Sequence, residues 1–308
     1  MTVLVREFRP ADAEATTEVL RAAIPFLVTT PEAMIRSVTH ANPARAFRLL
    51  VAEVDGRVVG RAEVGLAYES DTPGQAYANV YVHPEFRGRG AGSLLLRTAE
   101  EQLALAGARS VYSWVLDESA NRVFAERRGY EARRSAHFLR LDLADGTLPP
   151  LPEVPAGVEL RTAADFAADP RPLFTLDAAT TADEPGDIGT ELDDYEDWLT
   201  TAWGHPCLDR ELTVVAVVDG APAAFTAAHT DGAGRYLSGM TGVHRAHRGR
   251  GLAKLVKAHS LHRAGAAGLT EAFTGNDAEN QPMLAVNKWF GYDICATEVR
   301  HVRELGIG

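Results

Sequence analysis

Two stretches of the sequence are nearly the same: HPEFRGRGAG at residues 83–92 and HRAHRGRGLA at residues 244–253. Each contains Arg-Gly-Arg-Gly, and in each a histidine stands four residues before the first arginine. The second stretch begins 161 residues after the first, in a chain of 308 residues. One copy therefore lies in each half of the chain, which points to an internal duplication.

Further landmarks recur at nearly the same distance. Gly129-Tyr130 corresponds to Gly291-Tyr292, and Asp55-Gly56 corresponds to Asp219-Gly220. The stretch 5–12 corresponds to 158–165 at a shorter offset, so the second copy carries about ten extra residues before Asp219. A repeat of this size is a whole domain. Four prolines between residues 144 and 157 predict a semi-rigid linker. We therefore expect domains at 1–146 and 157–308, joined by a linker at 147–156.

The same elements are expected in both halves. Each Asp-Gly pair predicts a tight turn between two strands, because these residues tolerate positive φ. Each glycine-rich stretch is expected to join a strand to a helix. The expected strands are 3–8, 48–54, 58–68 and 76–82, then 158–160, 212–218, 223–229 and 236–243, and the central helices are 92–106 and 252–264. This order predicts an α/β fold with a mixed sheet in each half.

The glycine-rich stretches indicate an anion site. A turn without β-carbons at a helix N-terminus leaves several N–H groups free, and the helix dipole favours negative charge there. Arginine adds charge-assisted hydrogen bonds. A plain strand-to-helix turn is the alternative, but the duplication in matching context argues against it. No Lys-Ser or Lys-Thr follows, and no GxGxxG follows the first strand of either half, so neither a P-loop nor a Rossmann site is indicated.

In these glycine-rich stretches the chain resembles the GCN5-related N-acetyltransferases (GNAT superfamily). The acetyl-CoA loop of that family follows a strand and has the pattern Arg/Gln-x-x-Gly-x-Gly/Ala. Arg87, Gly90 and Gly92 match it, as do Arg248, Gly251 and Ala253. A second signature, an asparagine-bearing helix before Gly-Tyr, is fuller in the second half. The resemblance spans both halves and implies two tandem acyl-CoA N-acyltransferase domains, an arrangement similar to that of mycothiol synthase-like proteins, in which one half is active.

The resemblance implies a binding site for acetyl-CoA as cosubstrate, with no metal. Strand backbone before each loop would bind the pantetheine arm, the loop amides would hold the pyrophosphate, and asparagines of the second half would contact the arm or the adenosine end. The implied residues are Val80, Tyr81, Val82, Arg87, Gly88, Arg89, Gly90, Ala91, Gly92 and Ser93, together with Thr241, Gly242, Val243, Arg248, Gly249, Arg250, Gly251, Leu252, Ala253, Asn276, Asn280, Met283 and Asn287.

The implied reaction is direct aminolysis of the thioester by a primary amine, and two departures leave its proton path open. Ala125 and Asn287 stand where many members of the family carry an acidic tyrosine. No glutamate occurs near the start of either third strand, at residues 76–77 and 236–238. Tyr236 and His229 are the candidate catalytic residues, with a packed or surface side chain as the alternative for each.

The composition limits the partners. The net charge of −11 opposes binding of nucleic acid or an anionic membrane. The N-terminus lacks the apolar core of a signal peptide, and no apolar run reaches the roughly 18 residues of a membrane helix. Cys207 and Cys295, with no CxxC pair, are expected to be buried free thiols of a cytoplasmic protein. A monomer or a homodimer fits equally well.

The two halves differ in charge where the acceptor is expected. Between Asp177 and Asp197 the chain has nine acidic residues and no Lys or Arg, whereas the corresponding part of the first half is mainly basic. An acidic wall attracts a cationic amine. We therefore expect the second half to be the catalyst, acting on a small cationic amine. The alternative is that the acidic residues simply form the solvent-exposed face of a helix. A non-catalytic scaffold or sensor that binds acetyl-CoA remains the alternative function.

Overall fold

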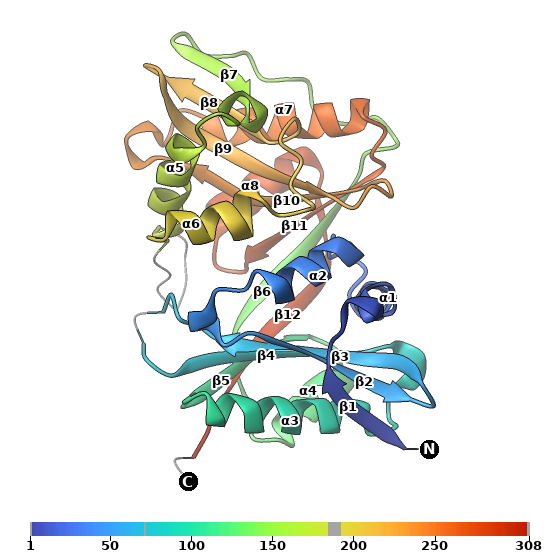
Figure 1. Ribbon diagram of the computed structural model, residues 1–308. Coiled ribbons are helices and arrows are strands. Elements are labelled where there is room, and N and C mark those ends of the chain that lie inside the picture. The colour runs from blue at the N-terminus through green and yellow to red at the C-terminus, as the bar shows by residue number, and fades with distance from the viewer. Residues whose placement is uncertain (1, 71, 184–191, 307–308) are drawn as a thin grey trace. The chain divides into compact units, whose positions relative to one another are not determined.

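The computed structural model describes residues 2–70, 72–183 and 192–306 (Figure 1). They form two compact units: an N-terminal unit of Met1–Ser135 with Ala296–Gly308, and a C-terminal unit of Ala136–Cys295. Each unit contains a mixed sheet with helices on both faces, which confirms the predicted α/β class.

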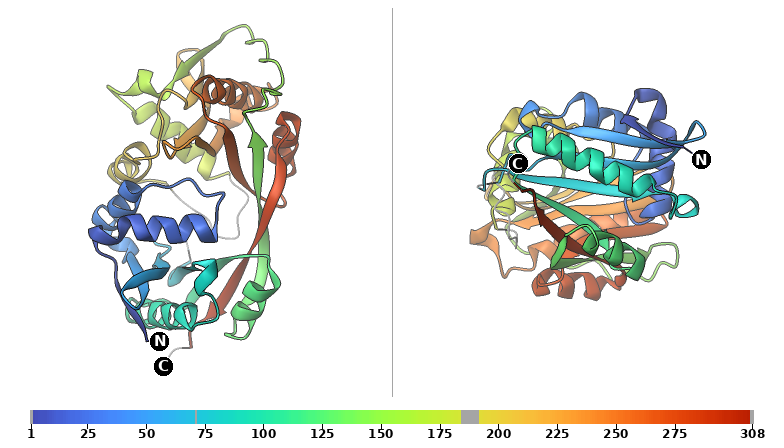
Figure 2. Two further views of the ribbon diagram at one scale, coloured as in Figure 1. Left: turned by 90° about the vertical axis from the view of Figure 1, so that its right-hand side faces the viewer. Right: turned by 90° about the horizontal axis from the view of Figure 1, so that it is seen from below.

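The sheet of the N-terminal unit runs in the order β1-β2-β3-β4-β5-β12. Neighbouring strands are antiparallel except for β4 and β5, which are parallel. The elements are β1 (Val3–Glu7), α1 (Ala13–Ala23), α2 (Pro31–Thr39), β2 (Arg48–Val54), β3 (Arg57–Leu66), β4 (Gln75–Val82), α3 (Ala91–Leu105), β5 (Ser110–Leu116), α4 (Ser119–Glu126) and β12 (Asp293–Glu304). Figure 1 and Figure 2 show α3 on one face of this sheet and α1 and α2 on the other.

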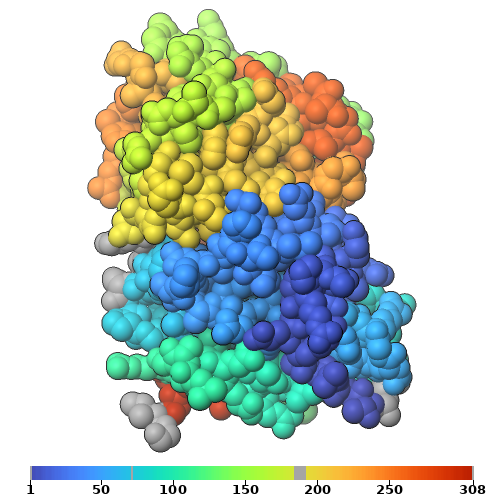
Figure 3. Space-filling view, viewed as in Figure 1, coloured from blue at the N-terminus to red at the C-terminus, as the bar shows by residue number. Residues whose placement is uncertain are grey.

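Alternating side chains of β2 explain why both faces are covered. Leu50, Ala52 and Val54 pack with α3, whereas Leu49 and Val51 pack with the helices of the other face. A strand that buries both faces reads as a continuous apolar run, as β2 does. The outer sides of α1, α2 and α3 form surface in the view of Figure 3 (blue and teal).

The sheet of the C-terminal unit has the order β6-β11-β10-β9-β8-β7, in which β10 and β11 are the parallel pair. Its elements are β6 (Glu131–Asp142), β7 (Val158–Thr162), α5 (Arg171–Thr181), α6 (Tyr195–Trp198), β8 (Val214–Val218), β9 (Ala221–Thr230), β10 (Arg235–Val243), α7 (Leu252–Ala266), β11 (Glu271–Asp277) and α8 (Gln281–Phe290). Val214, Ala216 and Val218 face α7, and Val215 and Val217 face α5.

The two predicted hairpin turns are confirmed. Asp55 and Gly56 have φ of 51° and 78°, and Asp219 and Gly220 have φ of 52° and 81°. Two consecutive positive φ values match the right-handed twist of the strands that the turn joins. These turns fix the register of β2 on β3 and of β8 on β9.

The last strand of each sheet comes from the other half of the sequence. Residues 298–304 of β12 pair with β5 of the N-terminal unit, and residues 136–142 of β6 pair with β11 of the C-terminal unit. The predicted ranges 1–146 and 157–308 describe the repeat in the sequence, whereas the compact units cross that boundary. Because the two copies are equivalent in pattern, sequence offsets cannot reveal which sheet a terminal strand joins.

Two further expectations concern the cysteines and membrane helices. Cys207 is buried and Cys295 is exposed, and neither forms a disulfide bond. The expectation of two buried thiols is therefore wrong for Cys295, which lies at the exposed start of β12. No helix within the described segments is long and apolar enough to cross a membrane.

Candidate functional site

In the N-terminal unit, the two parallel strands separate along their length. β4 and β5 pair only at residues 75–77 with 110–112. Beyond this point a side chain replaces the backbone as the hydrogen-bond partner, because Oδ1 of Asn79 accepts from the backbone N–H of Trp114 at 3.0 Å. The strands thus leave backbone groups without ladder partners on both sides of a gap.

The glycine-rich loop lies at the end of β4, as predicted. Gly88 and Gly90 have φ of 76° and 91°, and a β-carbon on either would meet no atom within 4 Å. Gly90 is the N-cap of α3 and provides no side-chain cap. The N–H groups of the first turn therefore point to open space, which is the arrangement expected for an anion site.

A cavity of about 590 Å³ lies in this gap and reaches the loop. Val80, Val82 and Leu96 line it on the α3 face, and Ala23 and Tyr81 line it on the α1 face. It thus extends through the sheet between β4 and β5. One end meets the loop, and the other opens toward the helices on the opposite face.

The lining of this cavity carries positive charge in an acidic protein. It includes Arg127, Arg128 and Arg87, of which Arg87 pairs with Glu118 at 3.3 Å, and none of the described lining residues is an aspartate or glutamate. Arg128 lies over the ring of Phe124 at 3.6 Å and donates to Oγ of Ser93 at 2.7 Å. Arg127 and Arg128 were not predicted from the sequence, although they stand as two basic residues directly before Gly129-Tyr130.

The face of β3 and β4 toward α1 carries a charged pair and tyrosines. Arg61, 2% exposed, donates to Oε2 of Glu63 at 2.7 Å, and its guanidinium lies 5.9 Å from the centre of the Tyr81 ring. Burial is the largest cause that raises the pKa of the Tyr77 and Tyr81 hydroxyls, which therefore stay protonated at neutral pH.

The C-terminal unit repeats the strand geometry. β10 and β11 pair at residues 235–238 with 271–274 and then separate. Gly249 and Gly251 again have positive φ with no atom within 4 Å of an added β-carbon. His244 caps the turn before the loop, since its Nδ1 accepts from the N–H of Ala246, just as His83 accepts from Glu85.

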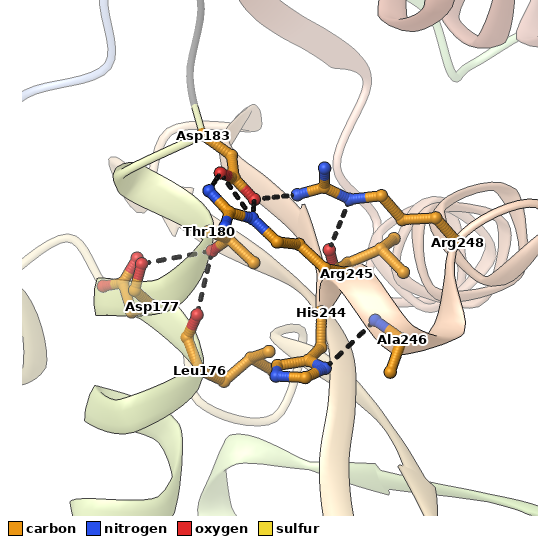
Figure 4. A network of polar contacts seen from close by, with 9 residues as sticks. Leu176, Asp177, Thr180, Asp183, His244, Arg245, Ala246 and Arg248 are labelled. Carbon is orange, nitrogen blue, oxygen red and sulfur yellow. Dashed lines mark hydrogen bonds and ion pairs between the residues drawn. The ribbon is translucent and has the colours of Figure 1, made fainter.

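In this unit the arginines of the loop region already bind a carboxylate. Asp183 pairs with Arg245 and Arg248, and Arg248 also donates to the carbonyl of Val243 at 3.1 Å (Figure 4). The hydrogen bonds from Arg245, more than any other contact, lower the pKa of Asp183 to about 2. The carboxylate is therefore ionised at neutral pH. The carboxylate of Asp183 thus pairs with the arginines that would otherwise be available to bind a phosphate.

Helix α5 also approaches the strand before this loop. A β-carbon on Gly242 would lie 2.4 Å from Oγ1 of Thr180, so only glycine fits at this point of β10. The Thr180 hydroxyl donates within its own helix, to the carbonyls of Leu176 and Asp177 (Figure 4). The predicted backbone segment Thr241–Val243 is therefore packed against α5 at its middle residue.

Comparison with known proteins agrees with the duplicated geometry. Residues 45–132 match the model of an acetyltransferase (GNAT) domain, and residues 176–292 match that of the acetyltransferase (GNAT) family. A mycothiol acetyltransferase of Nocardia farcinica is 31% identical over 90% of this chain and 88% of its own length. The chain belongs to the GNAT acetyltransferase family. It is therefore an acyltransferase with two GNAT domains in tandem.

Other relatives of this GNAT protein cover more than nine tenths of its length. A mycothiol acetyltransferase of Nocardiopsis dassonvillei is 28% identical over 92% of this chain and 90% of its own. Among solved structures, a tandem GNAT protein from the clavulanic acid biosynthesis pathway superposes with a TM-score of 0.74 at 24% identity, over all of both chains. A GCN5-related N-acetyltransferase from Sphaerobacter thermophilus gives 0.71 at 24% identity, over 98% of this chain and 95% of its own. These two structures show the shared fold.

The predicted asparagines of the second GNAT domain gather where β11 meets α8. Asn287, fully buried, donates its Nδ2 to Oδ1 of Asn276. Asn280 caps α8, since its Oδ1 accepts from the N–H of Met283 at 3.3 Å. The structure thus brings these four residues together, while their role toward acetyl-CoA stays a prediction.

The two candidate catalytic residues lie in the interior of the second GNAT domain. Tyr236 is fully buried and its hydroxyl is 2.7 Å from Oγ of Ser260. Burial, followed by the neighbouring His205, lowers the pKa of His229 to about 4, so its imidazole is neutral at pH 7. Tyr236 has no solvent access and packs in the hydrophobic core, where no substrate reaches it.

The acidic segment of the second GNAT domain is only partly described, since Glu184, Asp187 and Glu191 lie outside the described residues. Asp177 accepts from the indole N–H of Trp198 at 2.8 Å, and Asp194 caps α6. Together with Asp183, these carboxylates have structural partners. Helices α5 and α6 form surface of their unit in Figure 3 (yellow-green and yellow).

Proposed function

We propose that this protein is an acetyl-CoA-dependent N-acetyltransferase that acetylates a primary amine of a small, cationic molecule in the cavity of its N-terminal unit. The observation that carries the proposal is the cavity itself. It joins the glycine-rich loop to the gap between β4 and β5, and its lining holds three arginines and no described carboxylate.

The residues of this cavity fit acetyl-CoA. The open amides after Gly88 and Gly90, with Arg87 and Arg128, would hold the phosphates. Backbone groups of Val80–Val82 have no ladder partner on the β5 side and would bind the pantetheine amides. Acetyl-CoA supplies the acyl thioester. The apolar remainder of the lining would exclude water from the reacting carbonyl.

This assignment differs from the expectation that the second half is the catalyst. That expectation rested on its fuller asparagine signature and its acidic segment. In the structure, Asp183 pairs with both Arg245 and Arg248, whereas in the first loop region Glu118 pairs with Arg87 alone. Asp177, Asp183 and Asp194 have structural partners. We propose that the loop at Arg248–Ala253 is a second acetyl-CoA site. Acetyl-CoA would bind there only when the Asp183 carboxylate separates from Arg245 and Arg248.

The acceptor class and the compartment are also proposals. Two cysteines without a disulfide bond fit a reducing cytoplasm. The net charge of −11 favours an amine that is cationic in solution. The name of the relatives, mycothiol acetyltransferase, motivates a mycothiol-related amine in the first acceptor screen.

Matched loop variants test which unit works. In both Gly90→Glu and Gly251→Glu a carboxylate is placed at a helix N-cap with positive φ and open space around it. The backbone cost is thus similar in the two variants, and the new charge opposes the phosphates. Calorimetry with acetyl-CoA and thiol release with an amine panel report binding and turnover.

We expect Gly90→Glu to lower the affinity for acetyl-CoA and the turnover by at least tenfold, and Gly251→Glu to change turnover less. The reverse order would return catalysis to the C-terminal unit. Binding of acetyl-CoA without thiol release on any amine would favour the scaffold or sensor function instead.

A further inference from the structure

We propose that Glu298, which β12 brings from the end of the chain into the N-terminal unit, accepts the proton of the amine substrate. The inference rests on the proposed function. The acetyl-transfer site of the first half would then depend on a residue of the second half. Glu298 would also supply the proton acceptor that the sequence did not identify near the third strands.

The register of β12 places Glu298 beside the cavity. It pairs with Leu116 of β5 in antiparallel register, and Leu116 lines the cavity. Directly paired residues of neighbouring strands point to the same face of a sheet. Tyr81, which lines the cavity from β4, lies close enough for the charge of Glu298 to act on its hydroxyl.

The charges around Glu298 are otherwise engaged. Arg300, two residues further on the same strand, lies over the ring of Tyr112 at 5.0 Å. Arg61 of β3 pairs with Glu63. No residue in the described part of the chain donates a hydrogen bond to the carboxylate of Glu298 or forms an ion pair with it. This carboxylate is therefore available to a cation from solution.

Burial supports the same role, because it raises the pKa of Glu298 to about 7. A proton acceptor is most effective when its pKa lies near the working pH. The other groups on this face suit the role less well. Glu63 is held by buried Arg61, and the Tyr77 and Tyr81 hydroxyls are protonated at neutral pH and cannot accept a proton.

The transfer balances with one such group. The substrate ammonium loses a proton to the carboxylate of Glu298 and becomes a nucleophilic amine. Its nitrogen bonds to the carbonyl carbon as the carbon–sulfur bond breaks, and the second N–H proton goes to the departing thiolate. The products are an amide and a thiol, and Glu298 releases its proton to solvent.

Glu298→Gln in the full-length protein tests the inference. The matched control is Glu304→Gln on the same strand, whose side chain is exposed. Turnover is measured as thiol release from acetyl-CoA with D-glucosamine, putrescine and L-lysine amide, at pH values from 5.5 to 9. Calorimetry with acetyl-CoA is run in parallel.

We expect Glu298→Gln to bind acetyl-CoA within twofold of the wild type, to lose at least 30-fold in kcat, and to lack the rise in kcat near pH 7. Glu298→Asp should recover part of the activity, and Glu304→Gln should behave as the wild type. A wild-type protein that acetylates none of the amines overturns the proposed function and this inference with it. A wild type that turns over while Glu298→Gln keeps its kcat and pH profile overturns this inference alone.

Discussion

Lys257→Met should stabilise the C-terminal unit strongly below pH 7. Lys257 is 1% exposed on the inner side of α7, and its ammonium lies 5.1 Å from the centre of the Tyr292 ring. Burial lowers its pKa from 10.5 to about 7. Each pKa unit corresponds to about 1.4 kcal/mol, so a charged Lys257 costs the folded state up to about 5 kcal/mol. Methionine keeps the apolar stem and removes the charge.

The sign of the pH dependence follows from the lowered pKa. Below pH 7 the lysine is charged in both states and the full cost applies. Between pH 7 and pH 10.5 the folded state binds fewer protons than the unfolded state, so wild-type stability rises with pH. The advantage of Lys257→Met should therefore be about 2–5 kcal/mol at pH 6 and should shrink toward zero near pH 10.5.

Urea unfolding, followed by tryptophan fluorescence at pH 6, 8 and 9.5, measures this difference. Three of the four tryptophans, Trp198, Trp203 and Trp289, report on the C-terminal unit. The control is Lys254→Met on the same helix, where the ammonium lies 4.1 Å from the Trp289 ring and the side chain is partly exposed. It should change stability by less than about 1 kcal/mol at every pH. A Lys257→Met protein that is less stable than the wild type at pH 6 would refute the reasoning.

Three further predictions concern single side chains. Glu298→Gln should gain about 1–3 kcal/mol in unfolding free energy at pH 8 and nothing below pH 4.5. The reason is that the raised pKa of Glu298 makes wild-type stability fall as the pH rises from 4.5 to about 7. An equal gain in urea unfolding at both pH values would contradict this. His229→Gln should remove a loss of about 1–3 kcal/mol that the wild type suffers as the pH falls from 6.5 to about 4, seen in urea titrations across that range. Asp183→Asn in a Gly90→Glu background should tighten acetyl-CoA binding at the second loop about two- to fivefold in calorimetry, and unchanged affinity would show that Asp183 does not compete.

The sequence predicted the local elements well because their signals are local. The Asp-Gly turns, the two glycine-rich loops and the helices that follow them need only a few neighbouring residues to be recognised. The helix predicted at 92–106 spans Ala91–Leu105, and the strand predicted at 48–54 spans Arg48–Val54. Each of these is decided by periodicity and turn chemistry within the segment.

The site was harder to predict because its decisive features join distant segments. Nothing near Asp183 in the sequence indicates Arg245, 62 residues away. Glu298 lies far beyond the glutamate positions searched near the third strands, because the pairing of β12 with β5 links residues from opposite ends of the chain. Tyr236 appeared as a candidate from its residue type alone, and only packing shows it to be in the core.

The exchange of terminal strands has a consequence for how the protein is made. The ribosome completes residues 1–135 long before it reaches 298–304, so β5 lacks its partner strand β12 until synthesis is nearly finished. During this interval β5 presents an open edge to other chains, a known aggregation hazard. A nascent chain stalled or truncated before residue 298 would leave neither a finished first unit nor its Glu298. Fragments of the chain cut at the linker should therefore fail to fold as soluble single domains.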